Sequence, residues 1–332
     1  MKEDWANELR SRREKETIKL LLKYALTPDE IAEELHVFVE EAESILASLK
    51  EKGLNIIQSK DRKYMVHQFL QHGGHLTLSP KPDSQGWIKF GFITDNHLGN
   101  KHSRLDVLQA AFDLFEEEGI TEVLQAGNFV DGEFRFNRNE LLVFGMDAQL
   151  RYWANEWPVK NGITTHFISG DDHEGWWNQR ELINVGEHAE DIAKREGRTD
   201  LHYIGHVESD VELKTGKGSA VLRVMHPGGG SAYAISYAPQ KIVESLQGGE
   251  KPPVLLIGHY HKFDYCQPRE VHCISGGCTC DQTMFMRKNK IAAHVGFSII
   301  RIKQNSEDGH IERVGLEWIP FYDLKFYERR FG

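Results

Sequence analysis

Five short apolar runs between residues 88 and 257 each end in side chains that bind metals or carry protons. Their short length and the Gly, Asp and Asn residues that follow them predict strands. The turns after these runs contain, in order, Asp95-Asn96-His97, Gly127-Asn128, Asp171-Asp172-His173, His226 and His259-Tyr260-His261. Helical patterns alternate with the runs, which predicts an α/β fold. Because ligand sites of such sheets gather at the carboxyl ends of the strands, we expect these side chains to meet there.

The turns bring together carboxylate, amide and imidazole groups. A single histidine after a strand is more often structural, but five such turns in succession favour a shared metal site. This mixture of nitrogen and oxygen ligands suits Mn²⁺, Fe or Zn²⁺ better than Ca²⁺, which prefers oxygen ligands alone. The sequence therefore predicts a transition-metal site.

In order and spacing, these motifs resemble those of the calcineurin-like metallophosphoesterase family over about residues 87–265. The resemblance implies a four-layer αββα sandwich that holds two divalent metal ions, with manganese favoured and iron, zinc and magnesium as alternatives. It also implies the metal ligands, which are Asp95, His97 and His261 for one ion, Asp172, His226 and His259 for the other, and Asn128 at the bridging position.

The resemblance further implies a catalytic pair, in which His173 is the catalytic histidine and Asp131 the carboxylate that orients it. Two close cations would lower the pKa of a bridging water, so that hydroxide attacks the phosphorus atom in line. His173 would then protonate the leaving alkoxide. Arg135 and Arg138 are candidate phosphate-binding residues, although exposed salt bridges explain them equally well.

Two positions depart from the family pattern. Asn128 stands where the family usually has a bridging aspartate, and Asp172 stands where it usually has asparagine. A neutral amide oxygen bridges two cations less well than a carboxylate does, but the two exchanges together keep the ligand charge. We therefore predict an active site with altered metal preference rather than an inactive one.

Residues 1–70 predict a small separate domain. Three helical patterns and two short strands, over about residues 54–57 and 64–66, resemble a winged helix-turn-helix domain. Seven acidic residues and no lysine or arginine lie between Asp29 and Glu43, so this helix pair would repel a DNA backbone. Contact with a protein partner or self-association is therefore at least as well supported as DNA binding. Residues 71–86 read as a linker, and residues 87–332 as the metallophosphoesterase domain.

The sequence is compatible with three functions. The segment from Asp95 to Gly99 looks like the first motif of the DNA-repair nucleases in the family, which favours a phosphodiesterase or nuclease acting on nucleic acid. A phosphatase or small-nucleotide phosphodiesterase is one alternative, and a DNA-binding or scaffold protein with a vestigial metal site is another. The net charge of −10 argues against a globally basic nucleic-acid binder but allows a local basic groove.

The sequence also predicts the cellular location of the protein. No apolar run approaches the roughly 20 residues that a membrane-spanning helix needs. The N-terminal segment is too charged for a secretory signal. We therefore expect a cytoplasmic protein that does not associate with membranes.

Overall fold

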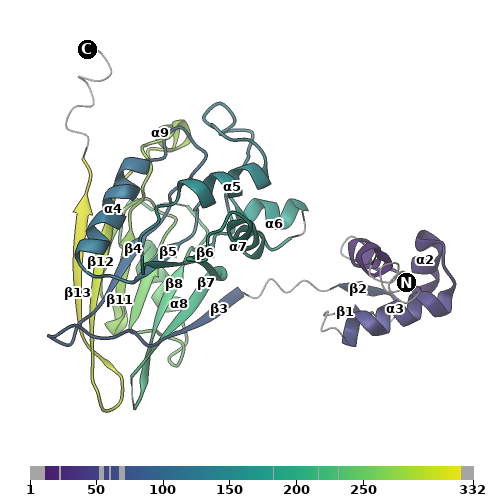
Figure 1. The fold of residues 1–332 in the computed structure, drawn as a ribbon, viewed down its shortest axis with the longest axis horizontal. Coiled ribbons are helices and arrows are strands. Elements are labelled where there is room, and N and C mark those ends of the chain that lie inside the picture. Colours follow the sequence, from purple (N-terminus) through teal and green to yellow (C-terminus); the bar gives the residue numbers. More distant parts are fainter. Residues whose placement is uncertain are drawn as a thin grey trace. The chain divides into compact units, whose positions relative to one another are not determined.

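The computed structural model describes residues 12–21, 24–51, 56–59, 61–66, 72–181, 183–215, 217–230 and 232–322 (Figure 1). The chain divides into two compact units, Met1–Leu70 and Gln71–Gly332. Among the described residues, no helix combines the length and the apolar composition that crossing a bilayer requires.

The first unit contains helices and a two-stranded ribbon. Its described elements are a helix over residues 12–21, α2 (Pro28–Leu35), α3 (Val39–Glu51), β1 (Ile56–Gln58) and β2 (Tyr64–Val66). A capping box starts α2, because the Thr27 hydroxyl accepts from the Glu30 N–H while the Glu30 carboxylate accepts from the Thr27 N–H. Leu21, Ile31 and Ile45 lie in its small core. The winged-helix assignment stays a prediction, and residues 54 and 55 of the predicted wing lie outside the described residues.

The second unit contains an 11-stranded sheet in the order β10-β11-β9-β8-β7-β6-β5-β4-β12-β13, with β3 also paired to β7. The strands are β3 (His72–Leu78), β4 (Ile88–Ile93), β5 (Glu122–Ala126), β6 (Thr164–Ser169), β7 (Leu201–Lys214), β8 (Ser219–Met225), β9 (Val254–Ile257), β10 (Phe263–Cys266), β11 (His272–Gly276), β12 (Gly296–Gln304) and β13 (Ile311–Pro320). Neighbouring strands from β4 through β7 are parallel, as are β8 with β9 and β9 with β11.

The sheet folds over itself at β7. Residues 201–206 of this strand pair with β6, whereas residues 208–214 pair with β8. Val207 lies at the change and has a φ of 65°, which is unusual for a β-branched residue. The two halves of the sheet therefore face each other across one apolar core, which includes Leu124 of β5 and Leu256 of β9.

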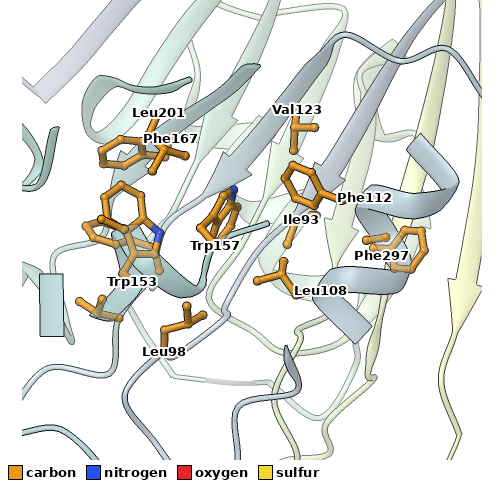
Figure 2. Packing of buried hydrophobic residues seen from close by; sticks show 14 of the residues in the cluster. Ile93, Leu98, Leu108, Phe112, Val123, Trp153, Trp157, Phe167, Leu201 and Phe297 are labelled. Atoms are coloured by element: carbon orange, nitrogen blue, oxygen red, sulfur yellow. The ribbon is translucent and has the colours of Figure 1, made fainter. Parts of the chain in front are cut away.

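Side chains alternate between the two faces of each strand, and this alternation builds the outer layers. Val123 of β5 points away from Leu124 and lies beside Phe112 of α4 (Leu105–Glu117), and the same apolar cluster includes Trp153 of α5 (Met146–Glu156) (Figure 2). The helix α7 (Val185–Arg195) belongs to the same layer, and α8 (Tyr237–Ser245) packs on the other half of the sheet. The order helix, sheet, sheet, helix confirms the α/β class and the four layers. The remaining described helices of this unit are α6 (Gly175–Glu181), η1 (Pro268–Glu270) and α9 (Met284–Lys288).

Part of the predicted linker is a strand. Residues 72–78 form β3 and pair in parallel with β7, and Leu76 and Leu78 pack against the core between the sheets. The sequence analysis assigned this stretch to a linker, but Gly74 allows the backbone of β3 to lie very close to that of β7. A Cβ atom at this position would lie only 1.5 Å from the Ile204 carbonyl oxygen.

Candidate metal centre

The five predicted turns follow β4, β5, β6, β8 and β9 and bring their side chains together. Six of the turn residues have left-handed backbone conformations, with φ between 44° and 80°: Asp95, His97, Asn128, His173, His259 and His261. Such conformations are strained for residues other than glycine and persist where the surroundings hold them. Hydrogen bonds between turns do so here, because the Asn128 carbonyl accepts from the Asn96 and His97 N–H groups and Asp95 Oδ2 accepts from the His259 N–H.

Asp95, His97 and His261 form the first group of candidate ligands. Asp95 Oδ1 lies 3.3 Å from His261 Nε2 and 3.9 Å from His97 Nε2, and the two Nε2 atoms are 3.1 Å apart. Burial alone would raise the pKa of Asp95, but the neighbouring positive charges of His261, His226 and His97 lower it. The carboxylate is therefore ionised and directed at both imidazoles.

Asp172, His226 and His259 form the second group. Asp172 Oδ1 lies 3.2 Å from His226 Nε2, and Asp172 Oδ2 lies 3.2 Å from His259 Nδ1. The opposite ring nitrogens face backbone carbonyls, since His226 Nδ1 donates to the Ala126 oxygen and His259 Nε2 to the Gly229 oxygen, both at 2.6 Å. These outer bonds direct the other ring nitrogen of each imidazole toward Asp172, the orientation found in metal-binding histidines.

Asn128 lies between the two groups. Its Nδ2 is 3.4 Å from Asp95 Oδ1, while its Oδ1 is buried without a hydrogen-bond partner among the described residues. A Cβ atom on Gly170 would meet both Asn128 Oδ1, at 3.0 Å, and Asp172 Oδ1, at 3.1 Å, so the two oxygens border the same space. Buried polar atoms rarely lack a partner. The unpartnered oxygen and the surrounding carboxylates and imidazoles fit divalent cations.

The predicted catalytic pair lies beside these groups. His173 Nδ1 donates to the Asp131 carbonyl oxygen at 2.7 Å and lies 3.5 Å from Asp131 Oδ1. Burial alone would lower the pKa of His173, but the hydrogen bond to Asp131 and the negative charges of Asp172 and Asp131 raise it to about 9. Asp131 is also 3.0 Å from His97 Nδ1, and Asn100 and Asn137 donate to it at 2.8 Å. One fixed carboxylate therefore orients His97 and His173 together.

A cavity of about 340 Å³ opens on these side chains and is lined by His97, Asn128, Asp131, Asp172, His173, His259 and His261, among others. Arg135 and Arg138 do not line it, although the sequence suggested that they bind phosphate. Arg138 instead pairs with Glu133 at 3.0 Å and is largely exposed.

Glu174 is a supporting residue to which the sequence assigned no role. Its Oε1 accepts from the Asn128 N–H at 2.9 Å and from the Gly170 N–H at 2.8 Å. This fully buried carboxyl joins the turns after β5 and β6, and burial raises its pKa to about 7. Its position directly after His173 is the only signal that the sequence offered.

Replacing Glu174 by alanine is expected to reduce the free energy of unfolding by about 2–4 kcal/mol, because two buried N–H groups lose their acceptor. Urea unfolding followed by circular dichroism measures this change. Glu174→Gln keeps an acceptor oxygen and should lose clearly less. Equal unfolding midpoints for the alanine variant and the unaltered protein would contradict the assigned role.

Two cysteines also support the site, and nothing in their spacing indicated it. Cys280 Sγ lies 3.7 Å from His261 Nδ1, on the side of the ring opposite Asp95. Candidate ligand atoms of His97, His261 and Cys280 all lie within 4.8 Å of one another. Cys278 donates to the Cys280 carbonyl oxygen. The four cysteines of the chain are free.

No protein-family model matches the chain, and no curated protein matches it. Among solved structures, the chain is similar to a novel archaeal phosphodiesterase at 15% identity, over 69% of this chain and 100% of that one, with a TM-score of 0.37. It is similar to the zinc complex of Vps29 from Entamoeba histolytica at 13% identity, over 71% and 100% of the two chains, with a TM-score of 0.33. GAP50 of Plasmodium is similar at 12% identity, over 70% and 89%, with a TM-score of 0.40.

Proposed function

We propose that the protein is a phosphoester hydrolase that uses two divalent metal ions. Asp95, His97 and His261 would hold one ion, Asp172, His226 and His259 the other, and Asn128 would lie between them. The observation that supports this most is the convergence of two Asp-His-His groups on the unpartnered Asn128 Oδ1. When bound, divalent ions at these residues would supply hydroxide near neutral pH and would polarise the phosphoryl oxygens.

The side chains beside the ligands provide proton transfer. His173 borders the cavity, and its hydrogen bond to Asp131 and the negative charges of Asp172 and Asp131 raise its pKa, which favours the protonated ring. It can therefore donate a proton to the leaving alkoxide. Asp131 fixes the ring through its carbonyl and carboxylate oxygens and stabilises the imidazolium.

The sequence favoured a phosphodiester of nucleic acid as the substrate, with a small-nucleotide phosphodiester as the alternative. The size of the cavity supports this alternative, since about 340 Å³ accommodates a small molecule better than a helical polymer, and a small-nucleotide phosphodiester is therefore the substrate that we propose. Manganese is the ion that we expect first. A DNA-binding or scaffold role with a vestigial site, and contacts made by the N-terminal unit, stay predictions.

An activity panel tests the proposal. We expect the purified protein to hydrolyse bis(p-nitrophenyl) phosphate with Mn²⁺, to lose this activity with EDTA and to regain it when Mn²⁺ is restored. The same panel should contain single- and double-stranded DNA, RNA, cyclic nucleotides and nucleoside monophosphates. Faster cleavage of polynucleotides than of cyclic nucleotides supports the nuclease. The absence of hydrolysis of every ester with Mn²⁺, Fe²⁺, Zn²⁺ and Mg²⁺ would instead point to a vestigial site.

A further inference from the structure

Three phenylalanines form a stacked row beside the candidate metal centre. The rings of Phe134 and Phe136 stack at 5.1 Å with an interplanar angle of 10°, and those of Phe136 and Phe285 stack at 4.9 Å with 30°. At the inner end, the Phe134 ring lies edge-on to His173 with the ring centres 5.5 Å apart. The row therefore begins one ring away from the predicted catalytic histidine.

These rings are not buried in the core. Phe136 is 51% exposed and Phe285 is 44% exposed, which is costly for large apolar side chains. By contrast, the neighbouring Trp177 is fully buried. The exposed row is therefore a surface that another molecule would cover.

The row and the metal ligands share one cavity. Phe134, Phe136 and Phe285 line its apolar part, while His97, Asp172 and His173 line its polar part. Hydrogen bonds hold the two parts together, because Asn137 Oδ1 accepts from the Phe134 N–H and Asn137 Nδ2 donates to Asp131. A molecule bound at the polar part thus meets the phenylalanine row without rearrangement of the loop.

The charge of the cavity restricts what this molecule can be. No lysine or arginine lines it among the described residues, whereas binding to a polyanionic backbone depends on such side chains. The apolar wall instead suits a flat, uncharged group, since every nucleobase has a face that stacks on aromatic side chains.

We propose that the nucleobase of the nucleotide unit whose phosphate lies at the metal centre packs against the exposed surfaces of Phe136 and Phe285. This inference rests on the proposed function and specifies its substrate class as a nucleotide ester recognised through its base. The phosphate meets the Asp and His side chains, and the base, one ribose away, reaches the phenylalanine row.

A comparison of two ligands that differ only in the base tests this proposal. With Mn²⁺ present, adenosine 5′-monophosphate should bind at least about fivefold more tightly than ribose 5-phosphate, as expected for one stacked base. Isothermal titration calorimetry measures both affinities without requiring turnover. In Phe136→Ala and in Phe285→Ala, the advantage of the nucleotide should shrink toward equality, while the affinity for ribose 5-phosphate stays unchanged.

Phe144→Ala is the matched control, because Phe144 is also exposed but does not line the cavity, and it should keep the advantage of the nucleotide. Equal binding of both ligands to the unaltered protein would overturn the stacking proposal and leave the metal centre intact. A nucleotide advantage that survives both Phe→Ala changes would overturn it too. Failure of ribose 5-phosphate and inorganic phosphate to bind with Mn²⁺ would instead overturn the proposed function on which it rests.

Discussion

Replacing His173 by alanine is expected to lower kcat for phosphodiester hydrolysis by about 10²- to 10⁴-fold, the usual contribution of a positioned proton donor. His173 is held by Asp131 and lies edge-on to His97 with the ring centres 4.3 Å apart. Because Asp131 also holds His97, removal of the His173 ring should leave the metal ligands in place. Mn²⁺ affinity measured by calorimetry should therefore stay close to that of the unaltered protein. A loss of activity with retained metal binding separates proton transfer from assembly of the site.

The pH dependence gives this prediction a second readout. Hydrolysis should fall as pH rises through the His173 pKa, because the proton that the ring donates is then lost. That pKa is raised to about 9 by Asp131 and Asp172, and bound cations would lower it through repulsion. The basic limb should therefore lie at or below this value and disappear in His173→Ala.

His188→Ala is a suitable control, since His188 also pairs with a carboxylate, Asp147 at 2.8 Å, but does not line the cavity. It should keep both kcat and the basic limb. If His173→Ala hydrolyses a dinucleotide, whose leaving group is an alkoxide, as fast as the unaltered protein does, the leaving group receives its proton from another donor.

The sequence predicted the parts of the site that depend on local pattern. Each ligand-bearing turn directly follows an apolar strand, and parallel strands place their carboxyl ends at one edge. The positions of Asp95, Asn128 and Asp172 beside one another follow from that rule. The left-handed conformations of Asp95 and Asn128 were not predicted, because hydrogen bonds from other turns, such as the one between the His259 N–H and Asp95, impose them.

Features that depend on long-range contacts escaped prediction. The strand β3 read as a linker because its pairing with β7 depends on residues far along the chain. Phe285 joins Phe136 only through the fold, so the sequence could not reveal the stacked row. Glu174 received no role because its two hydrogen-bond donors belong to different turns. Supporting contacts of this kind leave no periodic pattern.

Exchanging the amide and the carboxylate between positions 128 and 172 is the most direct test of the two-ion arrangement. Asp172→Asn alone removes the only carboxylate of the second group and should weaken Mn²⁺ binding there by about 100-fold or more. The binding free energy lost in this variant is a modest share of the electrostatic attraction between a carboxylate and a divalent ion at short range. Adding Asn128→Asp restores the ligand charge, so the double variant should recover most of that affinity. Calorimetric titration with Mn²⁺ gives both affinity and stoichiometry.

Asn128→Asp alone should destabilise the folded protein in the absence of metal and stabilise it when metal is bound. Asn128 Nδ2 lies 3.4 Å from Asp95 Oδ1, so a carboxylate at position 128 would repel Asp95. With EDTA, the Asn128→Asp variant should therefore unfold at a lower temperature than the unaltered protein. Saturating Mn²⁺ should raise the Tm of the variant by more than it raises the Tm of the unaltered protein, because binding stabilises the folded state.

Asp147→Asn is the matched control for the exchange, because Asp147 pairs with His188 and does not line the cavity. It should change neither affinity nor stoichiometry. A double variant that binds Mn²⁺ no better than Asp172→Asn would show that position 128 does not share its ligand oxygen with the second ion. Recovery of the affinity would instead show that the total charge of the ligands determines how many ions the centre holds, whether the carboxylate stands at position 128 or at position 172.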